Sequence, residues 1–382
     1  MTTDADAPVL TRRALNRALL ARQMLLERHA SPPLDAIEHL VGMQSQAPNP
    51  PYIGLWSRLD GFSFAEAGEL MTTRRAARIV LMRGTLHLVS ARDARALRPL
   101  TQVIQDDYLK TRAGDLAHVD LEAVFATARA YLEDEPRTDK EVRALLAERW
   151  PGEDAALLGW AVRCGVPLVQ VPPRGIWGAS GLARHTTLDA WLGGSPEPEA
   201  SLDEVVLRYL AAFGPASVRD VQHWSGLRRL GEVVERLRPR LLVFQDEQGR
   251  TLYDVPEAPR PDPGTPAPAR FVPDFDNLLL SHADRTRIIT EEHRRRVFTV
   301  NGIIRATFIV DGFVHGMWKI EKRGGKQGGK RGGATLRLTP FTPIPSTART
   351  ALEEEGKRLL AATDPDAASH EVEFLAPQEA SR

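Results

Sequence analysis

The sequence predicts an α+β protein with three tandem winged helix-turn-helix domains and a C-terminal β-rich subdomain. One order of elements, three helices closed by a hairpin, recurs along the first 256 residues. A proline-rich segment, interpreted as a linker, follows at 256–268, and beyond it apolar residues alternate with the period of two that strands have. The predicted domains are therefore residues 1–90, 91–195, 196–256 and 257–382.

Composition is typical of a globular protein with two or three domains. The chain has 382 residues, of which 42% are hydrophobic and 26% charged. Its 50 basic residues balance 50 acidic ones, so a nucleic-acid partner has to be met by a local basic patch. Net charge therefore neither supports nor excludes DNA binding.

Three features bear on the compartment. The single cysteine, Cys164, cannot form an intrachain disulfide, and its apolar neighbours predict a packed core residue. The N-terminus has no apolar segment before a cleavage site, and no run is long enough to cross a bilayer. We therefore expect a cytoplasmic protein without a membrane partner.

The first copy of the repeated order ends in a tight hairpin. Its two-residue turn is Arg83-Gly84, where glycine tolerates the positive φ that such turns require. Apolar periodicity assigns helices at 11–28, 33–44 and 64–71 and strands at 78–82 and 85–89.

The second copy follows a long helix and is the least regular. Pro172-Pro173 stands directly after its first strand and is expected to truncate the wing. The predicted segments are helices at 90–110, 120–133, 138–149 and 153–164 and a strand at 166–171.

The third copy is the clearest. Ser201-Leu202-Asp203-Glu204 is typical of a capping box, and the helix that it opens ends at Gly214-Pro215. Two more helices follow up to Pro239, and a hairpin is predicted at 241–255. Three helices closed by a hairpin make a winged helix-turn-helix.

The C-terminal subdomain is predicted to be mostly strands, closed by a helix at 346–362, with frayed last residues. Asp311-Gly312 is typical of a hairpin turn. The predicted strands lie at 271, 278–280, 287–289, 297–300, 303–310, 313–320 and 335–338.

The first candidate site is the pair Gln44 and Gln46, where an apolar helix runs into a proline cluster. Residues before proline avoid the helical region, so Ala47, Asn49 and Pro50 are expected to be extended and the helix to stop near Gln44. Side chains two apart on a continuous helix point away from each other. The two amides can therefore face one target only if the helix breaks there.

A carboxamide pair has a limited chemistry. An amide is not a strong base, but it accepts one hydrogen bond from a water and donates another, which fixes that water for attack. This is sufficient only for an activated leaving group, such as a base made cationic by alkylation, which leaves an oxocarbenium-like sugar. The alternative is that both amides satisfy free carbonyls at a helix end.

A second candidate is a basic, glycine-rich stretch between two predicted strands. Such a tip fits a groove and neutralises phosphates, and the alternative is a solvated loop without a partner. The cations are Lys322, Arg323, Lys326, Lys330 and Arg331.

Histidines supply the remaining candidates. His87 stands beside Arg83 in the first wing, where both are expected to meet DNA phosphates, and the alternative for His87 is an ordinary exposed strand histidine. His282 is a similar case. The ten histidines and Cys164 show no metal-ligand spacing, and no nucleophile elbow is present, so neither metal nor cofactor is expected.

Three segments, within this order of three winged helices, resemble the AlkZ/YcaQ superfamily of winged-helix DNA glycosylases over nearly the whole chain. They are Val41-Gly42-Met43-Gln44-Ser45-Gln46-Ala47, Arg83-Gly84-Thr85-Leu86-His87-Leu88-Val89 and Phe275-Asp276-Asn277-Leu278-Leu279-Leu280-Ser281.

The resemblance implies a C-shaped body around duplex DNA and a catalytic Gln-x-Gln motif at Gln44 and Gln46, the pattern of the AlkZ-like branch. That branch is known for excising N7-alkylated purines and unhooking interstrand crosslinks made by bacterial genotoxins, as monofunctional enzymes without metal. The middle residue is normally apolar, whereas this chain has Ser45. The family also places a β-hairpin against the minor groove, and the basic tip is the candidate here.

The resulting hypothesis is a DNA N-glycosylase that acts on alkylated purines in double-stranded DNA, in base excision repair or genotoxin self-resistance. It is expected to be a monomer and to associate with the nucleoid. The rival hypothesis is a non-catalytic winged-helix protein such as a transcriptional regulator, because winged helices bind DNA far more often than they cut bonds.

Overall fold

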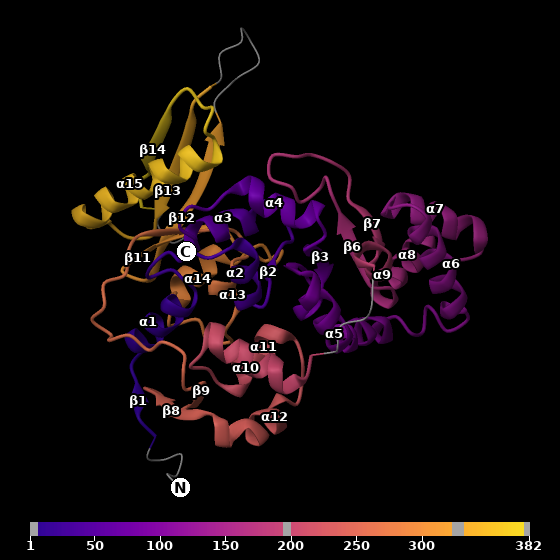
Figure 1. The fold of residues 1–382 in the computed structure, drawn as a ribbon, viewed down its shortest axis with the longest axis horizontal. Helices are drawn as coiled ribbons and strands as arrows, with labels where there is room; N and C mark the ends of the chain where they lie inside the picture. Colours follow the sequence, from indigo (N-terminus) through magenta and orange to yellow (C-terminus); the bar gives the residue numbers. More distant parts are fainter. Residues whose placement is uncertain (1–6, 194–199, 323–331, 378–382) are drawn as a thin grey trace.

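The computed structural model describes residues 7–193, 200–322 and 332–377. Within these ranges the protein is a mixed α+β structure whose strands form sheets of three, five and six strands. Figure 1 shows the N-terminal elements at the centre of the molecule, residues 121–187 on the right, residues 202–254 below, and the C-terminal sheet above. The N-terminal segment contacts each of the other three parts of the fold.

The first 90 residues contain helices near the predicted positions and the predicted hairpin, but the helix predicted at 11–28 ends at Arg22. Arg83 and Gly84 both have positive φ, 56° and 68°, as a two-residue hairpin turn requires. The elements are α1 (Arg12–Arg22), α2 (Pro33–His39), β2 (Met43–Gln44), α3 (Pro50–Arg58), α4 (Phe64–Thr72), β3 (Ala76–Val80) and β4 (Leu86–Ser90).

Helix α3 lies where the sequence analysis expects extended chain, so that expectation is wrong for Asn49 and Pro50. Asn49 is helical, with φ −81° and ψ −32°, and Pro50 is the first residue of the helix. The first turn of a helix leaves its N–H groups unbonded, so proline is tolerated there, and its fixed φ favours the start of a helix.

The second segment joins its hairpin to the first one. The predicted truncation of the wing is wrong, because β7 pairs antiparallel with β6 along four residues. Strand β6 also pairs with β3, which gives a six-stranded sheet of order β2-β4-β3-β6-β7-β5. The elements are α5 (Ala91–Thr111), α6 (Leu121–Asp134), β5 (Arg137–Thr138), α7 (Asp139–Arg149), α8 (Ala155–Gly165), β6 (Leu168–Val171), β7 (Arg184–Thr187) and α9 (Leu188–Leu192).

The third segment has the predicted three helices and hairpin. Ser201 and Ser217 cap two of the helices, each accepting a hydrogen bond from the backbone three residues on. Strand β1 (Val9–Leu10) adds to the hairpin in parallel. The other elements are α10 (Leu202–Phe213), α11 (Val218–Ser225), α12 (Leu230–Leu237), β8 (Leu242–Asp246) and β9 (Thr251–Asp254).

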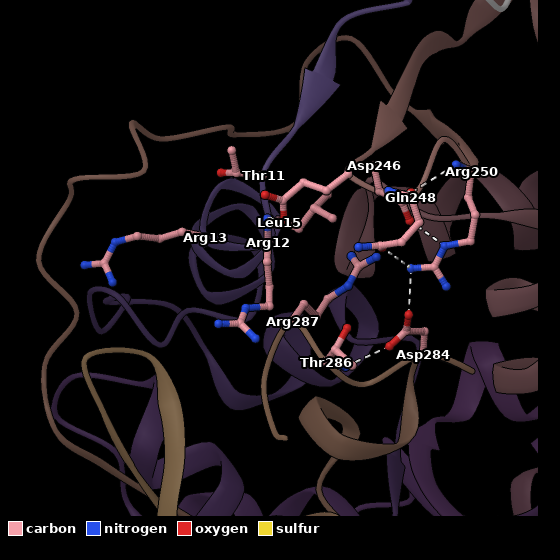
Figure 2. Close-up of a pocket in the computed structure, with 11 residues that line it drawn as sticks. Thr11, Arg12, Arg13, Leu15, Asp246, Gln248, Arg250, Asp284, Thr286 and Arg287 are labelled. Atoms are coloured by element: carbon pink, nitrogen blue, oxygen red, sulfur yellow. Dashed lines mark hydrogen bonds and ion pairs between the residues drawn. The ribbon is translucent and has the colours of Figure 1, made fainter. Parts of the chain in front are cut away.

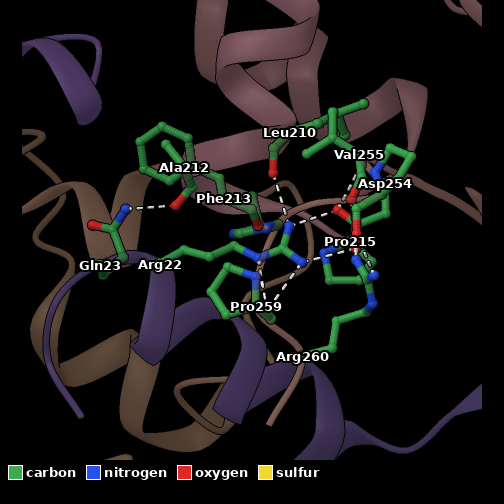
Figure 3. Close-up of polar contacts among 12 residues, drawn as sticks. Arg22, Gln23, Leu210, Ala212, Phe213, Pro215, Asp254, Val255, Pro259 and Arg260 are labelled. Carbon is green, nitrogen blue, oxygen red and sulfur yellow. Dashed lines mark hydrogen bonds and ion pairs between the residues drawn. The ribbon is translucent and has the colours of Figure 1, made fainter. Parts of the chain in front are cut away.

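A buried ion pair ties α1 to this third segment (Figure 3). Arg22 donates to both carboxylate oxygens of Asp254, at 2.6 and 2.8 Å, and both side chains are fully buried. The same guanidinium donates to the carbonyl oxygens of Leu210 and Pro259. The predicted linker at 256–268 is therefore held against α1.

The C-terminal subdomain is less rich in strands than predicted. Residues 278–280 and 297 are helical, and 287–289 are not in a strand. Residues 370–374 are a strand that pairs in parallel with β13, so the expected fraying is wrong there. The elements are β10 (Arg270–Val272), α13 (Asn277–Leu280), α14 (Glu291–Val297), β11 (Thr307–Val310), β12 (Phe313–Lys322), β13 (Ala334–Pro340), α15 (Ser346–Thr363) and β14 (His370–Phe374).

Two predictions about burial can be compared with the structure. Cys164 is buried, as predicted from its apolar neighbours. Among the described residues, no helix combines the length and apolarity needed to span a membrane.

Candidate active site

Gln44 ends the two-residue strand β2, and Gln46 lies in the bend that follows. Strand β2 pairs antiparallel with β4, with Gln44 opposite His87, and the Ser45 backbone N–H donates to the carbonyl of Leu86 at 2.7 Å. Side chains alternate along a strand, so Gln44 and Ser45 point to opposite sides of the sheet. Gln46 lies just beyond the strand.

The break in the helix comes earlier than the sequence analysis expects. Helix α2 ends at His39, not near Gln44, and Val41 and Gly42 then take positive φ values of 52° and 90°. A Cβ on Gly42 would lie 2.5 Å from Cγ1 of Val89, so only glycine fits this turn. The alternative in which the amides cap α2 is therefore wrong.

Gln44 is held by the tip of the neighbouring hairpin. Its side-chain oxygen Oε1 accepts a hydrogen bond of 2.9 Å from Nη2 of Arg83, and the residue is only 8% exposed. Arg83 also donates from Nη1 to the carbonyl of Trp224 in α11. Arg83 therefore links the Gln44 amide to the third segment of the fold.

Gln46 is exposed and contacts the same hairpin. Its Oε1 accepts a hydrogen bond of 3.2 Å from the backbone N–H of Leu86. Guanidinium and backbone N–H groups only donate, so both amide oxygens must face the hairpin. In the part of the chain that is described, neither amide nitrogen has a hydrogen-bond partner, and each oxygen keeps a second lone pair.

Ser45, on the other side of the segment, belongs to a buried polar network. Its Oγ accepts a hydrogen bond of 3.0 Å from Nε of Arg78, and its carbonyl accepts one of 2.6 Å from Nη2. Arg78 also donates to the side chain of Gln170 in β6. Burial lowers the pKa of Arg78 to about 10, so the group stays charged near neutral pH. A polar residue at position 45 therefore fits the buried guanidinium.

His87 is buried, so the alternative of an exposed strand histidine is wrong. The residue is 1% exposed, and its Nδ1 lies 2.8 Å from the carbonyl of Thr85. A carbonyl only accepts, so the proton is on Nδ1. Burial, reinforced by the charge of Arg83, lowers the pKa of His87 to about 3, and the ring is neutral near pH 7. A phosphate contact by His87 stays a prediction.

His282 resembles His87 in the structure. It is buried, and burial followed by the charge of Arg287 lowers its pKa to about 3. Its Nε2 lies 3.0 Å from the carbonyl of Phe213. The ring is therefore a neutral part of the core near pH 7.

Residues at the start of α13 hold the turn that precedes Gln44. Asn277 donates from Nδ2 to the carbonyl of Gly42 at 2.7 Å. Asp276, which caps α13, accepts two hydrogen bonds from Arg58, at 2.9 and 2.7 Å, and both side chains are fully buried. Sequence reasoning missed these anchors, although the capping position of Asp276 was a local signal for a helix.

The predicted basic tip is described only at its edge. Lys322 ends β12 opposite Ala334, and its Nζ lies 2.5 Å from Oδ1 of Asp364. The other predicted cations, Arg323, Lys326, Lys330 and Arg331, lie outside the described residues.

A cavity of about 820 Å³ lies between α1, the β8–β9 turn and residues 284–287 (Figure 2). Its cations are largely paired within the protein, since Arg250 contacts both Asp246 and Asp284 and Arg13 contacts Asp311. Neither candidate glutamine lines this cavity.

A second cavity, of about 710 Å³, has Arg83 in its wall, together with residues of α5 and the end of α11. It therefore adjoins the partner of Gln44. Among the described residues, no group of three or more His, Cys, Asp or Glu side chains is arranged to hold a metal ion.

Comparison with known proteins decides the family. The family model described as "DNA glycosylase AlkZ-like" matches residues 37–362, which is most of the chain. The chain belongs to the AlkZ-like DNA glycosylase family. The match includes Gln44, Gln46, the β3–β4 hairpin and the start of α13.

A curated sequence and a solved structure, both from Streptomyces sahachiroi, are similar to this AlkZ-like chain. One, an interstrand DNA cross-link repair glycosylase, is 26% identical over 181 residues, which cover 45% of each chain. The other is the solved structure of the DNA glycosylase AlkZ, with a TM-score of 0.75 and 20% identity over 96% of this chain and 100% of that one. The structural match shows that the fold is shared along the whole length.

Proposed function

We propose that this protein is a monofunctional DNA glycosylase that hydrolyses the N-glycosidic bond of N7-alkylated purines in duplex DNA. The observation that carries the proposal is that the side-chain oxygens of Gln44 and Gln46 both accept hydrogen bonds from the β3–β4 hairpin, which leaves both amide nitrogens free of the hairpin. The S. sahachiroi relative is named an interstrand DNA cross-link repair glycosylase, which supports interstrand crosslinks as a substrate class. A role in base excision repair or in self-resistance to a genotoxin follows from such a substrate.

The geometry favours water activation by positioning. Each amide keeps two N–H donors and one lone pair, so the pair can donate to one water and accept from it. An N7-alkylated purine is cationic and leaves without strong acid assistance, so the placed water meets an oxocarbenium-like sugar. Gln44 and Gln46 are the residues proposed to place that water and to stabilise the sugar cation.

The DNA partner is proposed to lie across the winged-helix segments, in a C-shaped arrangement, with the basic stretch from Lys322 to Arg331 against the phosphates. Each phosphate neutralised by lysine or arginine adds to a salt-dependent affinity. A monomer associated with the nucleoid suits this mode of binding. The predicted domain boundaries belong to the same proposal.

Release of alkylated base tests this function against the rival regulator. We expect the protein to release N7-methylguanine, or to unhook a crosslink, from duplex DNA of any sequence. We also expect tighter binding to the lesion duplex than to its unmodified copy. Tight binding to one unmodified sequence, with no base released from any substrate of the panel, would support the regulator and contradict the glycosylase.

An exposed apolar turn supplies one more prediction about the DNA surface. Val300 is fully exposed, at 103%, in the turn that joins α14 to β11, and the side chain of Arg295 is 77% exposed. The base of the turn is fixed by a bridge between Phe298 and Ile304, and the Arg285 guanidinium lies 4.9 Å from the centroid of the Phe298 ring. An apolar tip among arginines suits insertion between base pairs.

Val300→Asp is expected to lower excision from duplex DNA about tenfold or more, because a carboxylate at the tip is repelled by phosphates and cannot enter the stack. Excision from single-stranded DNA should change little. Leu182→Asp, at another exposed apolar position that is 70% exposed, is the matched control. Equal losses on both substrates, or in both variants, would contradict a wedge at Val300.

A further inference from the structure

We propose that Arg83 is a positioning residue for Gln44 and does not act mainly as a phosphate contact. The inference rests on the proposed glycosylase function. Its basis is that Arg83 uses two of its nitrogens inside the protein, one on Gln44 and one on the Trp224 carbonyl.

The backbone around Arg83 is closely confined. Arg83 has φ of 56° at the hairpin tip, and Gly226, which ends α11 with φ of 80°, packs against it. A Cβ on Gly226 would lie 3.1 Å from both the N and the Cα of Arg83. The tip of the hairpin therefore packs closely against the end of α11, and the hydrogen bond to Trp224 joins the two.

The guanidinium also fixes which end of the Gln44 amide faces outward. A guanidinium has donors only, so a rotated amide would place N–H against N–H and lose the 2.9 Å hydrogen bond. The group is planar and presents its donors in a fixed fork, so binding Trp224 also sets the direction of the bond to Gln44. The amide nitrogen of Gln44 is consequently turned away from Arg83.

The electrostatic setting agrees with a role inside the protein. Within the described residues no carboxylate forms an ion pair with Arg83, so its charge is not needed to balance an acid. Burial, reinforced by the charge of Arg285, lowers the pKa of Arg83 to about 10, and it remains protonated near pH 7. A half-buried cation without a counter-ion costs stability, and a function that depends on its geometry explains why the fold keeps it.

The two roles of Arg83 predict different kinetics. Loss of a positioning residue lets the Gln44 amide turn, so the rate of the chemical step falls while affinity for DNA is retained. Loss of a phosphate contact weakens binding to all sequences and reduces the salt dependence of affinity by about one ion. Single-turnover rates and dissociation constants at several salt concentrations separate the two.

The variants are Arg83→Met, which keeps an unbranched side chain without a donor, and Arg83→Lys, which keeps the charge and N–H donors but not the planar fork. We expect Arg83→Met to lower the single-turnover rate about 10²-fold, with the dissociation constant for lesion duplex and its salt slope unchanged. Arg83→Lys should recover part of the rate. Arg236→Met, at an exposed arginine of α12 paired with Asp203, is the control and should behave as wild type.

A double-mutant cycle completes the test. In a Gln44→Ala background, Arg83→Met should cause no further loss of rate, because the amide that it orients is gone. If Arg83→Met fails to fold, Arg83→Lys in the same cycle gives the coupling free energy between positions 83 and 44. Additive losses, a reduced salt slope or full activity of Arg83→Met would overturn the positioning role while leaving the glycosylase intact. If the wild-type protein releases no base, both the glycosylase function and the positioning role are contradicted.

Discussion

Gln44→Ala and Gln46→Ala are each expected to slow base release from N7-methylguanine duplex by about 10²–10⁴-fold, with affinity for that duplex unchanged. The reason is that each substitution removes a donor and an acceptor from the proposed water site while leaving the DNA surface intact. Single-turnover excision measures the rate, and a binding assay on the same duplex measures the affinity.

Gln44→Glu sharpens this prediction. The carboxylate has the shape of the amide and can still accept from Arg83, but it has no N–H to donate. A loss comparable to that of Gln44→Ala would assign the effect to the missing donor. Gln248→Ala, at an exposed glutamine in the β8–β9 turn, is the matched control. Loss of binding in step with loss of rate would contradict a role in the chemical step.

Asp276→Ala is expected to lower the free energy of unfolding by about 3–5 kcal/mol. The substitution leaves Arg58 charged in a fully buried site, and it also removes the cap of α13. Urea denaturation followed by circular dichroism measures the change.

The exposed pair of Asp203 and Arg236 is the control for this effect. These side chains are 32% and 58% exposed, so Asp203→Ala is expected to cost less than about 1 kcal/mol. Similar costs in the two variants would show that burial of the Arg58 pair contributes little.

Much of the helical structure was predictable because its signals are local. Thr138 and Glu141 form the capping box that starts α7, and Ser201 caps α10, where the sequence places both helices. The Arg83-Gly84 turn was predictable for the same reason, since the conformation of a tight turn depends on its own residues.

The wrong predictions arise where one local sequence pattern is compatible with two different secondary structures. The apolar run Leu278-Leu279-Leu280 is too short to distinguish a buried helical turn from a buried strand, and the cap from Asp276 decides for the helix. Pro50-Pro51 is compatible with the end of one helix and also with the start of another, and here it starts α3. Strand β14 pairs in parallel with β13, and such long-range pairing leaves no local signal.

The candidate site was predictable in its residues but not in its partners. Sequence reasoning placed both glutamines at a break in the chain after a helix, and the structure places that break at Val41-Gly42, before Gln44 and Gln46. Arg83, Arg78 and Asn277 are separated from the motif by between 33 and 235 residues. Contacts at such separations depend on the whole fold, so no spacing rule reveals them.

The short segment from Gly42 to Gln46 is hydrogen-bonded to three remote parts of the chain, through Asn277, Arg78 and Arg83. If Ser45 alone were replaced by an apolar residue, the buried guanidinium of Arg78 would lose its side-chain acceptor. Positions 45 and 78 should therefore change together among relatives, and grafting an apolar middle residue into this scaffold should require a compensating neutral side chain at position 78.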